Sequence, residues 1–287
     1  MTKFFKYQGL GNDFIVFDFL DEAGHQQLLR KIRLFSKTLC DRSISIGADG
    51  IVLLLPSTQN KLVRMVILNS DGSEAEMCGN GIRCLVKYLR DRERIQPNNE
   101  YEIETKAGLI KAAIDGDGLI SIDMGKPIFS PSLIPTNFTD FTKNISRGLI
   151  NYKNLNLDVY TVSMGNPHAI IFTKDLPHLP LLEIGPYIET NSHFPLKTNV
   201  HLVDVIDQST VSVKVWERGC GATQACGTGA CAVVVVSKAL GLCKHEVSVN
   251  LPGGTLYIDW PGENSSVFMK GPALRSFLGD VTLTNMK

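Results

Sequence analysis

Residues 78–81 read CGNG and residues 226–229 read CGTG, and each stretch opens a run of residues with helical periodicity. After each stretch, apolar residues recur every three to four positions, which is typical of a helix that buries one face. The second cysteine lies 148 positions after the first, close to half of the 287-residue chain. The sequence therefore predicts two equivalent helices, each beginning at a cysteine followed by a glycine.

The repeat extends beyond the two cysteines. A Gly-Asn pair at 11–12 precedes an apolar run, and a second Gly-Asn pair, 154 positions later at 165–166, precedes another. A polar residue stands nine positions before each cysteine, Asn69 before the first and Glu217 before the second. These offsets predict two similar lobes related by a pseudo-two-fold axis, with both cysteine-headed helices at one central cleft.

Short apolar runs bounded by Gly, Asn, Asp and Pro predict strands along most of the chain. They lie at 14–17, 51–55, 62–68, 101–105, 109–114, 159–163, 169–172, 200–205, 211–216, 247–251, 255–260 and 266–269. A third helical pattern spans 28–39. A strand-rich chain with few helices indicates the α+β class.

Composition favours a small-molecule partner. Lys plus Arg and Asp plus Glu both number 29, so no net charge attracts nucleic acid or an anionic membrane. The N-terminus lacks the apolar stretch and cleavage site of a signal peptide, and the longest apolar run, 230–236, is too short to span a bilayer. We expect a cytoplasmic protein that binds neither nucleic acid nor membrane.

The cysteines are distributed for chemistry and not for a disulfide framework. There are seven, an odd number, and five of them fall within two short segments. Four are interpreted as core residues, namely Cys40, Cys84, Cys231 and Cys243. No role is assigned to Cys220, a loop thiol without a counterpart in the other half.

A cysteine at a helix start is suited to act as a base. The first turn leaves backbone N–H groups without intrahelical partners and carries about half a positive charge. We expect this setting to lower the pKa of each thiol from about 8.5 towards neutrality. The same turns form a binding site for a substrate carboxylate and for the charge that develops when the α-proton leaves. The amides concerned are those of Gly79, Asn80, Gly227 and Thr228.

Two such thiols on opposite faces of an amino acid can invert its stereocentre. One sulfur removes the α-proton from one face, and the other returns a proton to the opposite face. This scheme requires no metal ion and no organic cofactor, and we expect neither.

Seven segments, in this order, resemble those of the diaminopimelate epimerase family. They are GLGNDF (9–14), DRSISIGADG (41–50), NSDGSEAEMCGNGIRC (69–84), SMGNPH (163–168), ERGCGATQACGTGAC (217–231), LPGG (251–254) and GPA (271–273). The resemblance implies an α+β fold of two pseudo-symmetric lobes, each a curved, mainly antiparallel sheet wrapped around a central helix. It assigns 1–122 plus 276–287 to the N-terminal lobe and 123–275 to the C-terminal lobe, with the active site between them.

The resemblance also implies a reaction, cofactor-independent epimerisation of LL-2,6-diaminopimelate to the meso form, which feeds lysine and peptidoglycan synthesis. It implies a homodimer. By motif, Cys78 and Cys226 are the catalytic pair, and His168 and Glu217 tune the thiols. The residues that would hold the distal end of the substrate are Asn12, Asn69, Asn166, Asn199 and Arg218, and Glu217 would hold the reacting amine. An arginine fork suits a carboxylate, while amide and carboxylate oxygens suit an ammonium group.

Two positions depart from the family pattern. Many members have Gln where this chain has Gly50, and Glu where it has Ala222. Both departures remove a polar group, so we expect looser selectivity for the distal end and a relaxed amino-acid racemase activity.

Other functions fit less well. A thiol-disulfide oxidoreductase usually has C-x-x-C, which is absent, and zinc sites use short two-residue spacings that these cysteines lack. Proline racemases, which resemble this chain in their cysteine-headed helices, generally have His where this chain has Asn80. A purely binding protein remains an alternative, which incorporation of solvent deuterium at a substrate α-carbon would exclude.

Overall fold

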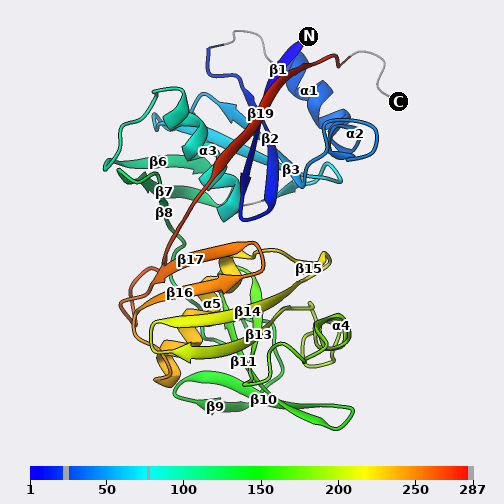
Figure 1. Ribbon diagram of the computed structural model, residues 1–287, viewed down its shortest axis with the longest axis vertical. Coiled ribbons are helices and arrows are strands. Elements are labelled where there is room, and N and C mark those ends of the chain that lie inside the picture. Colours follow the sequence, from blue (N-terminus) through cyan, green and yellow to red (C-terminus); the bar gives the residue numbers. More distant parts are fainter. Residues whose placement is uncertain (22–25, 76–77, 284–287) are drawn as a thin grey trace. The chain divides into compact units, whose positions relative to one another are not determined.

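The computed structural model describes residues 1–21, 26–75 and 78–283. The chain divides into two compact units, Met1–Ile122 with Gly271–Lys287 as unit 1 and Asp123–Lys270 as unit 2 (Figure 1). Residues 76–77 of the first cysteine motif lie outside the described residues, as do the last four of the segment expected to return to the N-terminal lobe.

Unit 1 is a mainly antiparallel sheet. Its strands are β1 (Thr2–Gly9), β2 (Asn12–Asp18), β3 (Gly50–Leu55), β4 (Val63–Asn69), β5 (Glu74–Ala75), β6 (Glu100–Thr105), β7 (Gly108–Ile114), β8 (Ile120–Asp123) and β19 (Leu274–Val281). They run in the order β19-β1-β2-β3-β4-β6-β7-β8, with β5 on β4. Among the described strands of this unit, only the β2–β3 and β4–β6 pairs are parallel.

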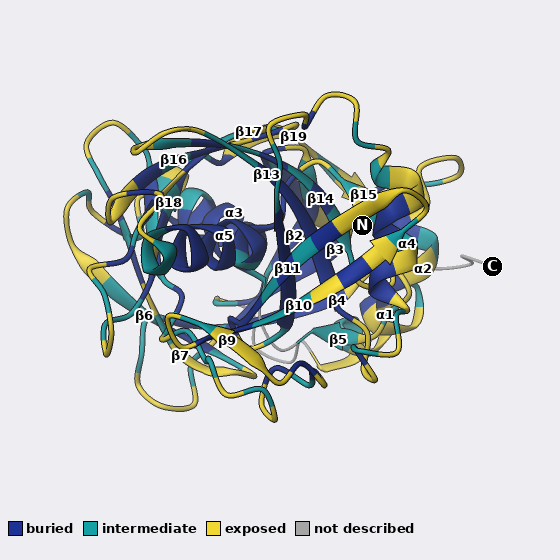
Figure 2. Cartoon of the chain, turned by 90° about the horizontal axis from the view of Figure 1, so that it is seen from below, coloured by how far each residue is buried: buried dark blue, intermediate teal, exposed yellow. Residues whose placement is uncertain are grey.

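Three helices complete unit 1: α1 (Gln26–Leu34), α2 (Ser36–Cys40) and α3 (Gly79–Asp91). The single helix expected over 28–39 is interrupted at Phe35, whose φ of −99° and ψ of 9° lie outside the helical region. Ile32 and Leu39 pack with inward-facing residues of β2, β3 and β4. Helix α3 contacts β1, β2, β3, β7 and β19, and it is buried along most of its length (Figure 2).

Unit 2 repeats this arrangement. Its strands are β9 (Asp140–Thr142), β10 (Ile145–Tyr152), β11 (Leu155–Ser163), β12 (Pro167–Phe172), β13 (Asn199–Asp207), β14 (Thr210–Glu217), β15 (Gly221–Thr223), β16 (Glu246–Leu251), β17 (Gly254–Asp259) and β18 (Phe268–Gly271). They run in the order β9-β10-β11-β12-β13-β14-β16-β17-β18, with β15 on β14. The parallel pairs are β12–β13 and β14–β16.

Helices α4 (Leu181–Glu189) and α5 (Gly227–Leu240) belong to unit 2. Helix α5 is apolar on all sides, and it contacts β11, β12, β13, β16 and β17. It ends at Gly241, where a φ of 81° requires the left-handed conformation that glycine adopts without strain. The sheet of unit 2 therefore surrounds a helix that begins at the second cysteine motif.

The register shows that the sequence repeat is a structural repeat. Phe14 on β2 pairs with Gly50 on the parallel strand β3, and His168 on β12 pairs with Asn199 on β13. Asn69 ends β4, and Glu217 ends the equivalent strand β14. The predicted α+β class with two similar sheet-and-helix lobes is confirmed.

All the expected strands are present, but several elements were not predicted. Strands β1, β10 and β19 lack a marked alternation of buried and exposed residues, and β19 is exposed along most of its length. Helix α4 contains Pro186, a residue that usually argues against a helix interior.

Candidate active site

Cys78 is the N-cap residue of α3. Its backbone is extended, with φ of −145° and ψ of 112°, and its Sγ accepts a hydrogen bond from the Gly81 amide at 3.4 Å. Gly79 and Asn80 form the first helical positions and are buried, whereas Cys78 is half-buried. The predicted helix start at this cysteine is confirmed.

Cys226 is the N-cap residue of α5 in the same manner. Its backbone is extended, with φ of −122° and ψ of 114°, and its Sγ accepts a hydrogen bond from the Gly229 amide at 3.3 Å. The Thr228 hydroxyl lies 3.5 Å from the sulfur. Gly227 is buried in the first turn. Both cysteine motifs thus place a thiol beside the first-turn amides of a helix, in the same local geometry.

The pKa of Cys226 is raised well above its ordinary value, so the predicted lowering is wrong for this thiol. Burial is the largest cause, because it removes water from the thiolate, and the negative charge of Glu217 adds to it. Hydrogen bonds from Thr228 and Gly229 lower the pKa of Cys226, but they do not offset the effect of burial. The helix start stabilises the thiolate, but desolvation outweighs it in this structure.

The asparagines of unit 1 form a chain from β2 to α3. Asn12 donates from Nδ2 to Asp49 at 2.9 Å and accepts at Oδ1 from Asn80 Nδ2 at 3.2 Å. Asn80 Oδ1 accepts in turn from Arg83 Nη2 at 2.8 Å. Asn69, at the end of β4, donates to Ser73 Oγ at 2.9 Å and is exposed. The structure brings Asn12 and Asn80 together at the start of the cysteine-headed helix.

In unit 2, Asn166 and His168 lie at the start of β12. Asn166 Oδ1 is 2.8 Å from His168 Nε2, and His168 Nδ1 is 2.9 Å from His201 Nε2 on β13. His168 is fully buried, and burial lowers its pKa, with smaller contributions from His201 and Arg218. His168 is therefore neutral, and its ring nitrogens contact Asn166 and His201.

Asn199 anchors the loop that carries Arg218. Its Nδ2 donates to the Pro167 carbonyl at 2.8 Å, and its Oδ1 accepts from the Arg218 amide at 3.0 Å. The Arg218 guanidinium donates to the Leu196 carbonyl at 3.2 Å and is accessible to solvent. The other N–H donors of this guanidinium can therefore bind a carboxylate.

Glu217 lies close to Cys226. Its Oε1 accepts a hydrogen bond from Thr223 Oγ1 at 2.6 Å, across the β14–β15 pair. Its carboxylate acts on the Cys226 thiol both through charge and through a hydrogen bond. A hydrogen bond from the thiol to the carboxylate favours the protonated sulfur.

Sequence reasoning missed two buried charged residues next to these groups. Arg83 is fully buried on α3 and, besides Asn80, donates to the Pro272 carbonyl at 3.2 Å. Glu189, at the end of α4, accepts from Trp216 Nε1 at 2.7 Å and from the Gly219 amide at 3.0 Å. An arginine three positions after Asn80, beside the apolar positions of the same helix, was a signal for the first, but no local pattern marks Glu189.

Gly50 occupies a position with no space for a side chain. A Cβ atom there would lie 2.6 Å from the Leu68 carbonyl oxygen and 3.3 Å from the Phe14 ring. By contrast, Ala222 is exposed on β15 opposite Trp216. The Gln that many relatives carry at the first position therefore requires a shift of the β3–β4 backbone in this chain.

Replacing Gly50 with Gln is expected to lower the free energy of unfolding by about 1–3 kcal/mol, because the new Cβ overlaps backbone. Urea unfolding measures the change. Gly116→Ala is the control, since a Cβ at that position meets no atom within 4 Å. A Gly50→Gln variant as stable as the parent would show that the strand pair accommodates the side chain.

The other cysteines are found where the sequence indicated. Cys40, Cys84, Cys231 and Cys243 are buried and Cys220 is exposed. Burial raises the pKa of Cys40 to about 11 and also raises the pKa of Cys84 and Cys243. All four buried thiols act as small apolar side chains.

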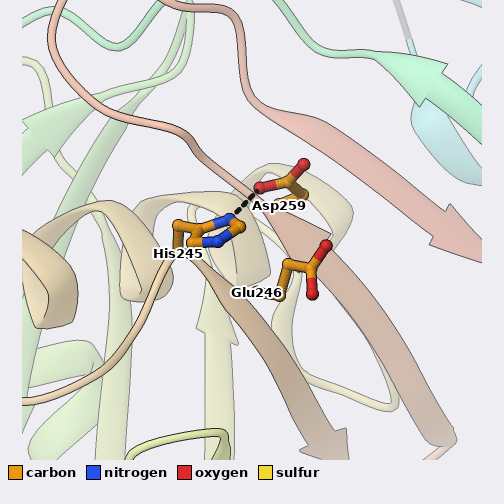
Figure 3. A group of neighbouring side chains, drawn as sticks. All are labelled: His245, Glu246 and Asp259. Carbon is orange, nitrogen blue, oxygen red and sulfur yellow. Dashed lines mark hydrogen bonds and ion pairs between the residues drawn. The ribbon is translucent and has the colours of Figure 1, made fainter.

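One trio of side chains in the described residues has the composition of a metal site. His245, Glu246 and Asp259 lie together on the β16–β17 pair, with His245 Nδ1 2.9 Å from Asp259 Oδ1 (Figure 3). His245 and Glu246 are exposed to solvent. The contact between His245 and Asp259 accounts for the cluster as a surface hydrogen bond. Among the described helices, none has the length and hydropathy needed to cross a bilayer.

Known proteins match the chain over nearly its whole length. A sequence model of diaminopimelate epimerase matches residues 4–130 and 160–275. A diaminopimelate epimerase of Prochlorococcus marinus (strain NATL2A) is 50% identical over 282 residues, which cover 98% of this chain and 99% of the relative. The corresponding protein of Carboxydothermus hydrogenoformans is 47% identical over 284 residues, 98% of this chain and 100% of the relative.

Among solved structures, a phenazine biosynthesis protein of the PhzF family from Bacillus anthracis has the same fold. Its TM-score is 0.68 at 17% identity, and the match covers 98% of this chain and 99% of that one. This likeness shows the fold alone, whereas the sequence matches show the family. The chain belongs to the diaminopimelate epimerase family.

Proposed function

We propose that the protein interconverts LL- and meso-2,6-diaminopimelate without a cofactor, with Cys78 and Cys226 as the acid/base pair. The observation that carries the proposal is the duplicated geometry, in which each cysteine caps a buried helix and accepts a hydrogen bond from the third amide after it. A capping thiol beside helical amides can exchange a proton where a carboxylate is bound. The proposed mechanism requires one such element from each unit.

In this mechanism, Cys226 rests as the thiol, because it is buried and hydrogen-bonded to Glu217. Cys78, which is half-buried, is the thiolate that removes the α-proton from one face of the substrate. Cys226 then delivers its proton to the opposite face, and the two sulfurs have exchanged protonation states. The reverse reaction begins from that second state. No redox change and no metal ion enters this balance of protons.

The helical amides stabilise the negative charge that develops at the substrate carboxylate. They belong to Gly79 and Asn80 at the start of α3, and to Gly227 and Thr228 at the start of α5. Such preorganised donors stabilise a transition state without reorganisation, and each is worth about 3–4 kcal/mol where measured in other enzymes. Since both cysteines are N-cap residues, each thiol is held next to the amides that bind the carbanion.

The distal end of diaminopimelate needs partners for a carboxylate and an ammonium group. Arg218 offers the carboxylate a guanidinium that is accessible to solvent and held in place through its amide by Asn199. Asn12 at the start of β2 and Asn166 just before β12 occupy equivalent places in the two units, and Asn69 ends β4. Glu217 is the partner of the reacting amine. The product would feed lysine and peptidoglycan synthesis in the cytoplasm.

The decisive experiment follows α-deuteration in deuterated water with LL- and meso-diaminopimelate, beside glutamate and proline. Deuterium is expected to enter the α-carbon of both diaminopimelate isomers as they interconvert, since the returned proton comes from a solvent-exchanged thiol. Exchange in glutamate or proline would support the relaxed selectivity expected from Gly50. Failure to deuterate any of the four would exclude the proposed chemistry.

A homodimer is part of the proposal. In the described sheet of unit 1, β19 pairs only with β1, and it exposes Leu274, Phe277 and Leu278. An apolar edge strand of this kind is suited to pair with a second copy. Leu278→Glu is expected to give a monomer in light scattering, because it places a charge in that contact. Leu182→Glu on α4, where the leucine is also exposed, should leave the dimer intact. If the Leu278→Glu variant is still a dimer, the interface does not involve this part of β19.

A further inference from the structure

A second histidine lies behind His168. His201, on β13, is fully buried, and its Nε2 is 2.9 Å from His168 Nδ1. The two rings are 5.1 Å apart between centroids, with an interplanar angle of 37°. On its other side, the His201 ring packs directly against Gly229, where a Cβ would lie 2.2 Å from Cε1. Gly229 is the residue whose amide binds the Cys226 sulfur. His201 thus lies between His168 and the first turn of α5.

The direction of each hydrogen bond in this chain is fixed by chemistry. Asn166 Oδ1 can only accept, so the Nε2 of His168 carries the proton and donates. A neutral His168 then has an unprotonated Nδ1, which must accept from His201 Nε2–H. The remaining His201 nitrogen, Nδ1, is buried without a hydrogen-bond partner. An unpaired lone pair there costs less than a buried, unpaired N–H, which agrees with the Nε2–H tautomer of His201.

This order determines which end of the Asn166 amide faces away from His168. Because the carbonyl oxygen accepts from His168, the NH₂ group is the end left to act as a donor. With the opposite tautomer of His168, its Nε2 would accept a hydrogen bond from the Asn166 NH₂ group. The carbonyl oxygen of Asn166 would then be the end that faces away from His168. The amide orientation of Asn166, and therefore its preference for an anionic partner, depends on the proton at His201 Nε2.

The fold alone does not require this polar chain. In unit 1, the positions equivalent to His168 and His201 are Phe14 and Val52, given by the matching β2–β3 and β12–β13 registers. Both are buried apolar side chains. The same sheet and helix thus assemble around hydrophobic residues in one unit and around a histidine pair in the other. Hydrophobic packing would serve stability at least as well as a buried polar pair with an unsatisfied nitrogen.

We propose that His201 is a positioning residue that fixes the tautomer of His168, so that Asn166 presents its NH₂ group to a carboxylate of the substrate. The proposal rests on the proposed function for the identity of that substrate. The order of the hydrogen bonds does not depend on the proposed function, because it is a property of the protein without ligand. His201 touches no reacting atom and acts through His168 and Asn166.

Two substitutions separate the donor from the volume of the side chain. His201→Gln keeps an N–H group that can reach His168 Nδ1, whereas His201→Leu fills similar space without a donor. The tautomer of His168 is read from ¹⁵N NMR of protein labelled at histidine, with the resonance assigned by a His168→Gln variant. The parent and His201→Gln are expected to show a single Nε2–H form of His168, and His201→Leu a mixture of tautomers.

The kinetic expectation follows from one misoriented amide. His201→Leu should raise KM for diaminopimelate roughly tenfold with a smaller change in kcat, because a binding contact is lost in ground and transition states alike. His201→Gln should restore KM to within about twofold of the parent, a rescue that packing alone does not predict. Thermal unfolding confirms that both variants are folded at the assay temperature.

Either of two results would overturn the proposal. One is a His201→Leu protein in which His168 keeps its single tautomer and KM is unchanged. The other is an equal loss in His201→Gln and His201→Leu, which would assign His201 to packing against Gly229. If the parent protein does not deuterate diaminopimelate, the proposed function fails, yet the tautomer measurement still decides the role of His201.

Discussion

Replacing either Cys78 or Cys226 with alanine is expected to reduce the interconversion of diaminopimelate isomers by about 10²–10⁴-fold, the usual contribution of one positioned acid or base. In the proposed mechanism the two thiols act on opposite faces of one carbon, so neither can take over the other's step. Both cap helices in the same conformation, and each therefore holds its sulfur beside the amides that bind the carbanion. The loss should appear mainly in kcat, because alanine leaves those amides in place.

Isotope exchange makes this expectation sharper. A protein with one thiol can remove and return a proton only on its own face, so any residual deuterium should enter one isomer with retention of configuration. The two alanine variants should then act on opposite isomers. Proton NMR in deuterated water, with chiral analysis of the product, measures both outcomes.

Cys220→Ala is the control for general effects of removing a thiol, since Cys220 is exposed on a loop. It should turn over like the parent protein. Inversion at near-normal rates in Cys78→Ala or Cys226→Ala would reject the two-thiol mechanism, while leaving the family membership unaffected.

The helix starts could be predicted because they are local features of the sequence. A cysteine followed by Gly-x-Gly and then by apolar residues at helical spacing defines an N-cap without reference to the rest of the chain. Its recurrence after 148 positions revealed the duplication, and the duplication revealed two similar sheets. The strands at 14–17 and 169–172 followed from their apolar runs in the same way.

Other parts of the site depend on contacts distant in sequence. The pKa of Cys226 is raised because the folded chain excludes water from it and brings Glu217 close, and neither effect can be read from the CGTG motif. The His168–His201 contact joins parallel neighbouring strands separated by the whole of α4. Glu189 reaches the Gly219 amide across a separation of 30 residues. Sequence patterns predict which elements form, but partner choice between them requires the fold.

Glu217 is expected to have opposite effects on the reactivity of Cys226 and on turnover. Its carboxylate raises the pKa of the Cys226 thiol through its charge and through a hydrogen bond. Glu217→Gln removes the charge, so the thiol should ionise at lower pH than in the parent protein. Because the thiolate is the nucleophile, alkylation by iodoacetamide should begin at lower pH.

Turnover should fall in the same variant, because Glu217 is also the proposed partner of the reacting amine. Removing one member of a close charge pair costs about 2–5 kcal/mol, so kcat/KM should decrease by roughly 30-fold or more. A variant with a more acidic thiol but slower turnover would show that thiolate supply does not limit the reaction.

The alkylation profile is best measured by mass spectrometry in a Cys78→Ala, Cys220→Ala background, so that Cys226 is followed without the half-buried and the exposed thiols. Thr223→Val is the matched control for the hydrogen bond that orients Glu217, because it removes the hydroxyl 2.6 Å from Oε1 and leaves the charge. Glu246→Gln, an exposed carboxylate on β16, controls for a change in net charge. An unchanged or upward-shifted profile in Glu217→Gln would mean that burial alone sets the pKa of Cys226, and that Glu217 acts only on the substrate.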